Sequence, residues 1–145
     1  MDIEPCFNLK LRQADRVLTN LYNQHLSDLD LKITQFSVLR ALWLMKTAAQ
    51  KQLEKVLLVD QATLTRSLQP LLRQGYISRA QDEKDRRISL VSLTPEGIAL
   101  YKQAEPRWQV AQQQVNAILG DDTLEKLVNA SDALIALKQT DKSSG

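Results

Sequence analysis

The stretch from residue 53 to residue 97 decides the fold of this chain. It reads LEKVLLVDQATLTRSLQPLLRQGYISRAQDEKDRRISLVSLTPEG. Two helical patterns come first, at about 51–57 and 60–74, and two strand-length runs joined by a charged turn follow. A further helix start closes the stretch. This order predicts a helix-turn-helix followed by a β-hairpin, which together make a winged helix-turn-helix.

The second helix of this unit has clear start and stop signals. Asp60 is a suitable N-cap, and Gly75 suits the left-handed position that follows a helix. Pro70 lies inside the helix and removes one backbone donor, so we expect the last turn to bend. Four leucines recur on one face and are predicted to point inward: Leu64, Leu68, Leu71 and Leu72.

The polar face of the 60–74 helix is the predicted DNA-reading surface. Gln61 and Thr63 lie near its N-terminus, where recognition helices usually meet base edges. Glutamine can bond to an adenine edge and Arg66 to a guanine edge, while Thr65 suits a phosphate oxygen. The alternative is that these side chains form an ordinary solvated helix face.

The turn of the predicted hairpin is strongly charged. Strands are expected over 76–81 and 86–93, and three cations lie close to the turn between them: Lys84, Arg86 and Arg87. One of these arginines could enter a narrow, negatively charged minor groove. Asp82 and Asp85 would be repelled by phosphate, so we expect them to orient the arginines. The alternative is a solvated charged hairpin without a ligand.

Composition bounds the class of protein but does not identify it. The chain has 145 residues, enough for one domain with a sizeable core, and 43% of them are hydrophobic. Four glycines and four prolines favour helix. The net charge of +2 does not by itself predict a nucleic-acid partner. Between residues 61 and 93, however, six cations face three anions, a local excess of positive charge.

Helices are predicted before the winged unit. Residues 5–26 carry an apolar seam from Phe7 to His25 with intervals of four and three. Thr34 is the expected N-cap of a second helix, whose apolar face includes Phe36, Leu39, Leu42 and Trp43. Residues 46–51 are interpreted as a polar, weakly structured segment.

A long helix is predicted after the wing. It starts at Thr94-Pro95-Glu96, runs to about residue 119, carries a coiled-coil-like seam over residues 101–118, and should kink at Pro106. Gly120 is expected to end it, and residues 138–145 to fray. The candidate caps of a last amphipathic helix are Asp121 and Asp122.

The fold class that follows is mainly α with a two- or three-stranded β wing. Residues 34–94 are predicted to bind DNA, and 1–33 with 95–145 to form a helical dimerisation region within one continuous compact fold. The first and last helices carry apolar faces that a small winged unit is not expected to bury alone, so a homodimer is predicted. The alternative is that these helices pack within one chain.

Several segments resemble the MarR family of transcriptional regulators. They cover 34–39, 53–56, 59–66, 71–77, 82–87 and 93–97. The resemblance implies a homodimer that binds pseudo-palindromic operators and is controlled by a small ligand or an oxidant. It also implies that Asp85 and Arg87 form a wing signature, which leaves Lys84 or Arg86 as the better candidate for the groove. Two features depart from the family: Leu58 replaces a frequent glycine, and residues 50–52 lack the usual serine or threonine cap.

The resemblance raises two kinds of sensor. A small aromatic effector could lie in a crevice lined by Tyr22, Trp43, Tyr101 and Trp108, although the alternative is that these aromatics are ordinary core. One branch of the family uses a cysteine of the N-terminal helix as a hydroperoxide sensor, which makes Cys6 the redox candidate. Because Cys6 is the one cysteine of the chain, a disulfide would need the partner chain. The alternative is an idle thiol.

The remaining expectations concern the cellular compartment and the functional class of the protein. A lone cysteine, no long apolar run and no secretory signal favour the cytoplasm. His25 is the single histidine, and neither a metal-ligand spacing nor a nucleophile with its base is visible, so no metal, cofactor or enzymatic activity is expected. The favoured function is a DNA-binding regulator, expected to be a repressor. The alternative is a winged-helix module that binds proteins and not DNA.

Overall fold

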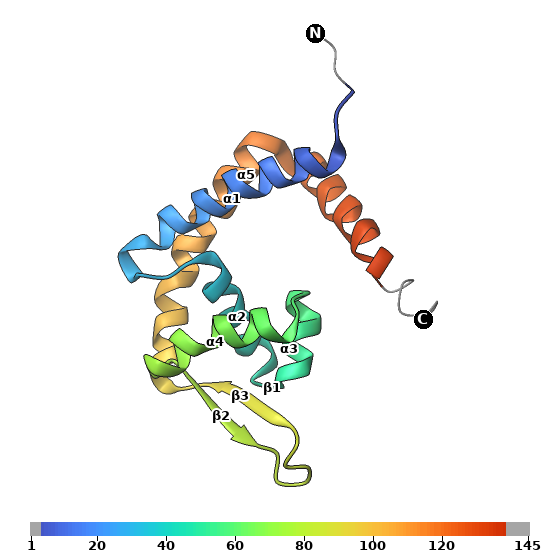
Figure 1. The fold of residues 1–145 in the computed structure, drawn as a ribbon. Coiled ribbons are helices and arrows are strands. Elements are labelled where there is room, and N and C mark those ends of the chain that lie inside the picture. The colour runs from blue at the N-terminus through green and yellow to red at the C-terminus, as the bar shows by residue number, and fades with distance from the viewer. Residues whose placement is uncertain (1–3, 139–145) are drawn as a thin grey trace. The chain divides into compact units, whose positions relative to one another are not determined.

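The computed structural model describes residues 4–138, and it confirms a mainly helical fold with a small antiparallel sheet (Figure 1). In chain order the elements are α1 Phe7–Leu26, the 3-10 turn η1 Ser27–Leu29, α2 Ile33–Met45, β1 Thr47–Ala49, α3 Gln50–Leu57, α4 Gln61–Arg73, β2 Ile77–Gln81, β3 Ser89–Leu93 and α5 Pro95–Ile135. The chain divides after Trp108 into two compact units. Within residues 4–138, every helix is too short or too polar to span a membrane.

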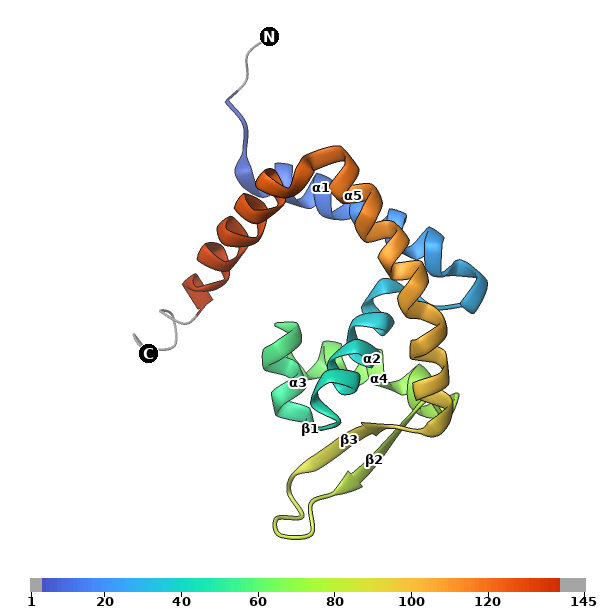
Figure 2. The same ribbon diagram turned by 180° about the vertical axis from the view of Figure 1, so that it is seen from behind.

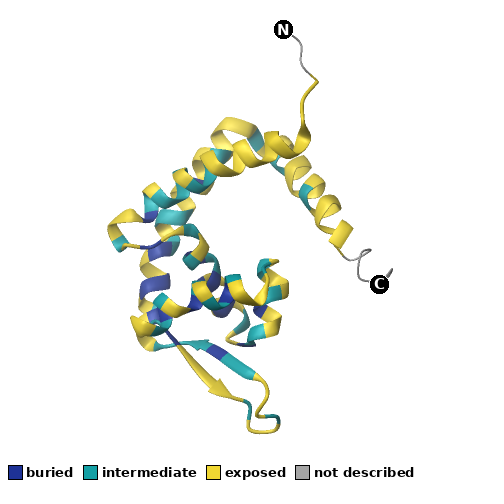
Figure 3. Cartoon of the chain, in the orientation of Figure 1, coloured by how far each residue is buried: buried dark blue, intermediate teal, exposed yellow. Residues whose placement is uncertain are grey.

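The core of the first unit lies where α2, α3 and α4 meet the sheet (Figure 3). It contains Phe36, Leu39, Leu42, Leu53, Leu64, Leu68, Leu71, Ile77 and Val91, each at most 2% exposed. Burial of one such leucine contributes about 1.5–3 kcal/mol. Three of the four leucines predicted to point inward from α4 belong to this core, and Leu72 packs against it partly buried.

Helix α4 starts and stops where its sequence signals place it. The Oδ1 of Asp60 accepts a hydrogen bond from the backbone N–H of Thr63 at 2.7 Å, which is an N-cap. Gln74 is the C-cap, and Gly75 follows with φ of 78°, a conformation that favours glycine. Pro70 lies inside the helix, which continues for three residues beyond it.

The sheet has three strands in the order β1-β3-β2, both pairs antiparallel. The prediction of weak structure over 46–51 was wrong, because these residues form β1 and the start of α3. Ala48 of β1 pairs with Val91 of β3, and both side chains are buried. A strand of three residues is too short to show a readable alternation, so only pairing with β3 reveals it.

The third strand is shorter than the sequence pattern indicated. It begins at Ser89, whereas residues 86–88 belong to the turn. The N–H of Ile88 donates to the carbonyl of Asp85 at 3.0 Å, and the N–H of Asp82 donates to the carbonyl of Ile88 at 2.9 Å. These two bonds close the hairpin below the charged tip. Figures 1 and 2 show this hairpin projecting from the helices of the first unit.

The predicted N-cap of α2 was wrong. The helix begins at Ile33, so Thr34 lies inside its first turn. The side chain of Gln35 accepts a hydrogen bond from the N–H of Lys32 at 3.0 Å, and Asn23 of α1 accepts one from the N–H of Ile33 at 2.7 Å. A local side chain, Gln35, and a side chain of another helix, Asn23, therefore share the capping of this turn, and the contact from Asn23 depends on the fold.

The turn between α3 and α4 has a leucine at a left-handed backbone position. Leu58, the C-cap of α3, has φ of 56° and ψ of 49°, which is the left-handed region. A residue with a Cβ atom costs about 1–2 kcal/mol in this conformation. The turn between α3 and α4 therefore keeps the backbone that glycine would favour, although a leucine occupies it.

Helix α5 starts as predicted and is broken at one position. Thr94 Oγ1 accepts from the N–H of Gly97 at 3.1 Å, which is the expected cap. A Cβ atom at Gly97 would lie 1.9 Å from the carbonyl oxygen of Tyr76, so only glycine fits there. The backbone leaves the helical region at Gly120, with φ of 79° and ψ of 160°. Two helices thus meet at Gly120, whereas the expected kink site, Pro106, keeps helical φ and ψ.

The second unit contains the last of these helices. The side chain of Asn116 donates to Asp121 at 2.7 Å, and Lys126 lies 3.7 Å from Asp122. These contacts involve both predicted capping aspartates. Of the segment predicted to fray, Lys138 is helical, and residues 139–145 lie outside the described part of the chain.

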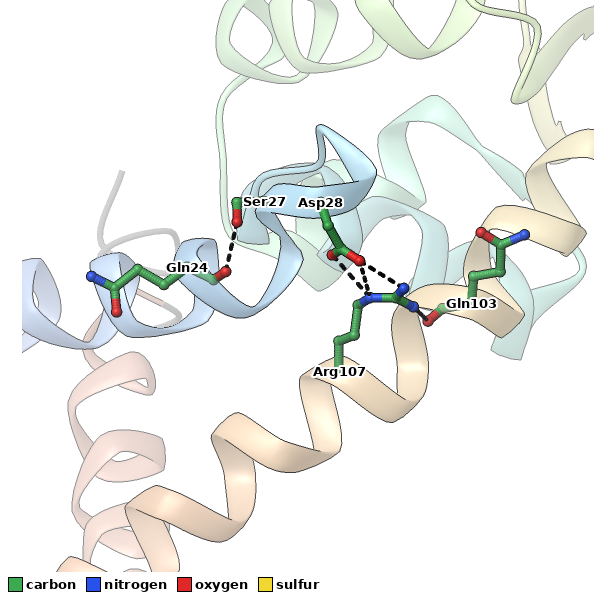
Figure 4. A network of polar contacts seen from close by, with 5 residues as sticks. All are labelled: Gln24, Ser27, Asp28, Gln103 and Arg107. Carbon is green, nitrogen blue, oxygen red and sulfur yellow. Dashed lines mark hydrogen bonds and ion pairs between the residues drawn. The ribbon is translucent and has the colours of Figure 1, made fainter.

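An ion pair holds the first half of α5 against the turn that follows α1 (Figure 4). Arg107 donates to both carboxylate oxygens of Asp28 at 2.8–3.0 Å and also to the carbonyl of Gln103. The hydrogen bonds from Arg107 lower the pKa of Asp28 below its usual value. Both partners are accessible to solvent, so this contact orients α5 more than it stabilises the fold.

Candidate nucleic-acid interface

The N-terminal half of α4 presents polar side chains to solvent. Gln61 and Arg66 are exposed, and Thr63 is half-buried. Arg66 Nη2 donates weakly to the hydroxyl of Thr63 at 3.4 Å, so these two side chains lie on the same face. The helix N-terminus below them is satisfied by Asp60. Two of the four predicted reading residues, Thr63 and Arg66, therefore share one face of α4, and Gln61 is exposed at the first residue of the helix.

Thr65 lies differently from the other three. It is half-buried, and its hydroxyl accepts a hydrogen bond from the side chain of Gln50 at 3.3 Å. Gln50 is the first residue of α3, so this bond joins the two helices of the helix-turn-helix. The structure places Thr65 between α3 and α4, where it positions α4 as well as facing outward.

The wing tip is built around its two aspartates. Asp85 accepts from the backbone N–H of Arg87 at 3.1 Å and from the guanidinium of Arg87 at 3.0 and 3.1 Å. Asp82 accepts from the backbone N–H of Lys84 at 3.1 Å. The hydrogen bonds from Arg87 lower the pKa of Asp85 and raise that of Arg87. Both carboxylates act on the turn itself.

The other two cations of the tip are exposed. Within residues 4–138, neither Lys84 nor Arg86 has an acidic side chain within ion-pair distance. Their charges are therefore unopposed by direct pairing, in contrast to the charge of Arg87. This difference distinguishes a cation that shapes the wing from cations that remain available to an anionic partner.

A hollow of about 330 Å³ lies between α3, α4 and the base of the wing. Its polar lining comes from three elements and the wing turn: Gln50, Lys51, Glu54, Gln61, Arg87 and Ser89. We call this site the α3–wing hollow. Gln61 and Arg87 could be predicted as site residues from the sequence, whereas the other four could not, because α3 and β3 approach α4 only in the folded chain.

The aromatic residues predicted to line an effector crevice form mostly a stack. Ring centroids are 5.0 Å apart for Trp43 and Tyr101, 5.7 Å for Tyr101 and Phe36, and 5.6 Å for Phe36 and Trp108. Tyr22 lies apart, in a different hollow of about 260 Å³ on α1 and α2. Burial raises the pKa of Tyr22 and Tyr101. The four residues therefore do not surround one cavity within the first unit.

Cys6 is exposed and precedes the first residue of α1. His25 is half-buried in the last turn of that helix. In the part of the chain that the structure describes, no three His, Cys, Asp or Glu side chains gather as a metal site would require.

The fold and this surface define a winged helix-turn-helix protein. A sequence model of the MarR family matches residues 31–89, from before α2 to the first residue of β3. The multiple antibiotic resistance protein MarR of Salmonella typhimurium is 41% identical over 96 residues, which are 66% of this chain and 64% of that protein. The chain thus matches just under two thirds of that relative's length.

Two further comparisons extend this likeness. The organic hydroperoxide resistance transcriptional regulator of Bacillus subtilis is 33% identical over 104 residues, 72% of this chain and 71% of that protein. The crystal structure of a MarR mutant from E. coli complexed with operator DNA has a TM-score of 0.81 and 29% identity, covering 88% of this chain and 91% of that one. The chain belongs to the MarR family.

Proposed function

We propose that this chain is a cytoplasmic, sequence-specific DNA-binding regulator that represses transcription as a homodimer. The observation that carries the proposal is the α4–wing surface. A capped helix with an exposed polar N-terminal half lies beside a hairpin whose tip holds two exposed cations, Lys84 and Arg86. The likeness to a MarR structure complexed with operator DNA supports the same function.

The surface suits the two grooves of duplex DNA. Helix α4 enters the major groove, where Gln61 and Arg66 reach base edges. The wing tip reaches the neighbouring minor groove with Lys84 or Arg86. The Asp85–Arg87 pair keeps the tip in shape and leaves the exposed cations to meet DNA.

A second copy of the chain explains the exposed apolar residues of the outer helices. On α1, Phe7, Leu11 and Val17 are 76%, 50% and 69% exposed. In the second unit, Ile118, Val128 and Leu134 are 78%, 56% and 52% exposed. Apolar side chains in such series mark an interface. Residues 1–33 and 95–145 form it, and they place two 34–94 units at operator half-sites about 34–36 Å apart.

Release from DNA requires a signal that favours another arrangement of the dimer. A ligand can shift the equilibrium only if it binds the DNA-free conformation better. We propose a small aromatic effector near Trp43, Tyr101 and Trp108, or oxidation of Cys6. The name of the Bacillus subtilis relative, a regulator of organic hydroperoxide resistance, supports testing the second route. If Cys6→Ser still loses DNA on treatment with an organic hydroperoxide, oxidation of Cys6 is not the signal.

Selection of bound duplexes from a random pool tests the proposed function. We expect an enriched, roughly palindromic sequence with two half-sites one helical turn apart. Affinity for it should fall steeply between about 50 and 200 mM salt, because phosphate contacts release counterions. No enrichment, together with weak and salt-independent binding, would contradict DNA binding and favour a protein-binding module.

A further inference from the structure

We infer that the α3–wing hollow is the seat of one backbone phosphodiester of bound DNA, with Lys51 as its main cation. The inference rests on the proposed function and adds a binding site to it. The site recognises a phosphate of the duplex without reading sequence. It also adds residues of α3 and β3 to a surface that otherwise consists of α4 and the wing tip.

The position of the hollow follows from how a winged helix meets DNA. When α4 occupies the major groove and the wing tip reaches the adjacent minor groove, the strand that separates the two grooves passes between them. That strand is a row of phosphodiesters. The α3–wing hollow occupies this place, since its lining includes Gln61 of α4 and Arg87 of the wing.

The charges around the hollow suit an anion. Lys51 lines it, and among residues 4–138 no acidic side chain is within ion-pair distance of its ammonium group. Arg87 also lines it, but its guanidinium is already held by Asp85. The side-chain amide of Gln50 adds a hydrogen-bond donor, since only one of its two N–H groups is used by Thr65. A bound phosphate would therefore pair more favourably with Lys51 than with Arg87.

An unsatisfied hydroxyl provides an independent observation. Ser89 lines the same hollow, and its Oγ is buried without a hydrogen-bond partner in the described part of the chain. A buried hydroxyl without a partner is unfavourable, because it has lost its contact with water and gained no hydrogen bond in return. Because Oγ is buried, rotation about the Cα–Cβ bond of Ser89 must bring the hydroxyl into the hollow before a phosphate oxygen can accept from it. Bound DNA would supply the acceptor that the free protein lacks.

One carboxylate opposes this site. Glu54 lines the hollow one helical turn after Gln50, and a phosphate bound there would be repelled by it. The affinity of the hollow for a phosphate is therefore moderate, and a substitution can raise it as well as lower it. A seat for phosphate predicts opposite effects when Lys51 and Glu54 are each replaced by the neutral glutamine.

The test measures binding of the full chain to a labelled duplex of random sequence from about 50 to 200 mM NaCl. For Lys51→Gln we expect roughly tenfold weaker binding and a salt slope that is smaller by about 0.9 per phosphate contact, hence about 1.8 for a dimer. Glu54→Gln should bind more tightly. Lys55→Gln is the matched control, because Lys55 is exposed on the same helix and does not line the hollow.

Ser89→Ala tests whether Ser89 contacts a phosphate or acts only in the fold. We expect a few-fold weaker DNA binding with an unchanged or higher melting temperature, because the substitution removes an unpaired hydroxyl from the free protein. A lower melting temperature with unchanged DNA affinity would show that Ser89 acts only in the fold, and it would count against the seat.

Two results would overturn the inference while leaving the proposed function intact. One is a Lys51→Gln variant that binds the duplex with the affinity and salt slope of the wild type. The other is a Lys51→Gln variant whose DNA binding is unchanged but which inorganic phosphate no longer stabilises against heat. That result would make the hollow a site for a free small anion. If the wild type itself binds no duplex, it is the proposed function that fails.

Discussion

Helices α4 and α1 differ in how far their apolar side chains are exposed to solvent. Leu64, Leu68 and Leu71 of α4 are at most 1% exposed, whereas Phe7 and Val17 of α1 are 76% and 69% exposed. The winged unit therefore completes its core within one chain. The rest of the first unit leaves these side chains of α1 exposed, and a second copy can cover them. The comparison separates residues needed for folding from residues needed for pairing.

The largest expected effect is on the complete core. Leu68→Ala removes a fully buried side chain and should lower the free energy of unfolding by about 2–5 kcal/mol, because a cavity remains. Urea unfolding followed by circular dichroism measures it. Leu11→Ala on α1 is the control at a half-exposed position. An equal loss for both variants, measured at a concentration where the chain is monomeric, would remove the contrast between the two helices.

The next effect is on pairing. Val17→Asp places a charge on the exposed apolar face of α1, and we expect the dimer to dissociate at about 1 µM while the winged unit stays folded. Analytical ultracentrifugation measures the mass. Asn8→Asp adds the same charge at an exposed polar position on the opposite side of α1 and should remain dimeric. A Val17→Asp protein as dimeric as the wild type would place the interface elsewhere.

A smaller effect is expected on the exposed face of α4. Arg66→Ala should weaken binding to the selected operator by about 1–3 kcal/mol and relax the preference at one base pair of each half-site. Arg86→Ala should weaken binding to all sequences alike and reduce the salt slope. Competition with single-base operator variants distinguishes the two. A uniform loss for Arg66→Ala would mean that Arg66 contacts phosphate and not a base.

The smallest effect concerns the shape of the wing. Hydrogen bonds from Arg87 lower the pKa of Asp85 in the folded chain, so Asp85 stabilises the fold at pH values above about 3.9, its unfolded value. This contribution disappears as the pH falls through the lowered pKa. NMR titration of the Asp85 carboxyl should show the low midpoint, and Arg87→Gln should return it toward the usual value. An unchanged midpoint in Arg87→Gln would mean that the ion pair does not persist in solution.

The sequence predicted the parts of the fold that depend on local signals. Asp60, Gly75 and Thr94 act at helix ends as expected, because capping uses the residue's own neighbours. The first turn of α2 was missed because Asn23 reaches it from α1. Strand β1 was missed because only its pairing with β3 defines it.

The site was predictable to a similar extent. The exposed residues of α4 and the wing tip could be identified from spacing and charge. Lys51, Glu54 and Ser89 could not, because they come together only when α3 and β3 flank α4. The aromatic crevice expected from four residues is instead a stack through Phe36 with Tyr22 apart, because a residue type predicts burial but not which aromatic rings meet.

The most direct test of the whole account is the mass of the complex formed with the selected operator. Sedimentation velocity on the labelled duplex should show two chains per operator, and the free protein at twice 16.4 kDa. This result would join the exposed face of α1 to the α4–wing surface in one assembly. A free protein at 16.4 kDa that leaves the duplex unbound would contradict the account.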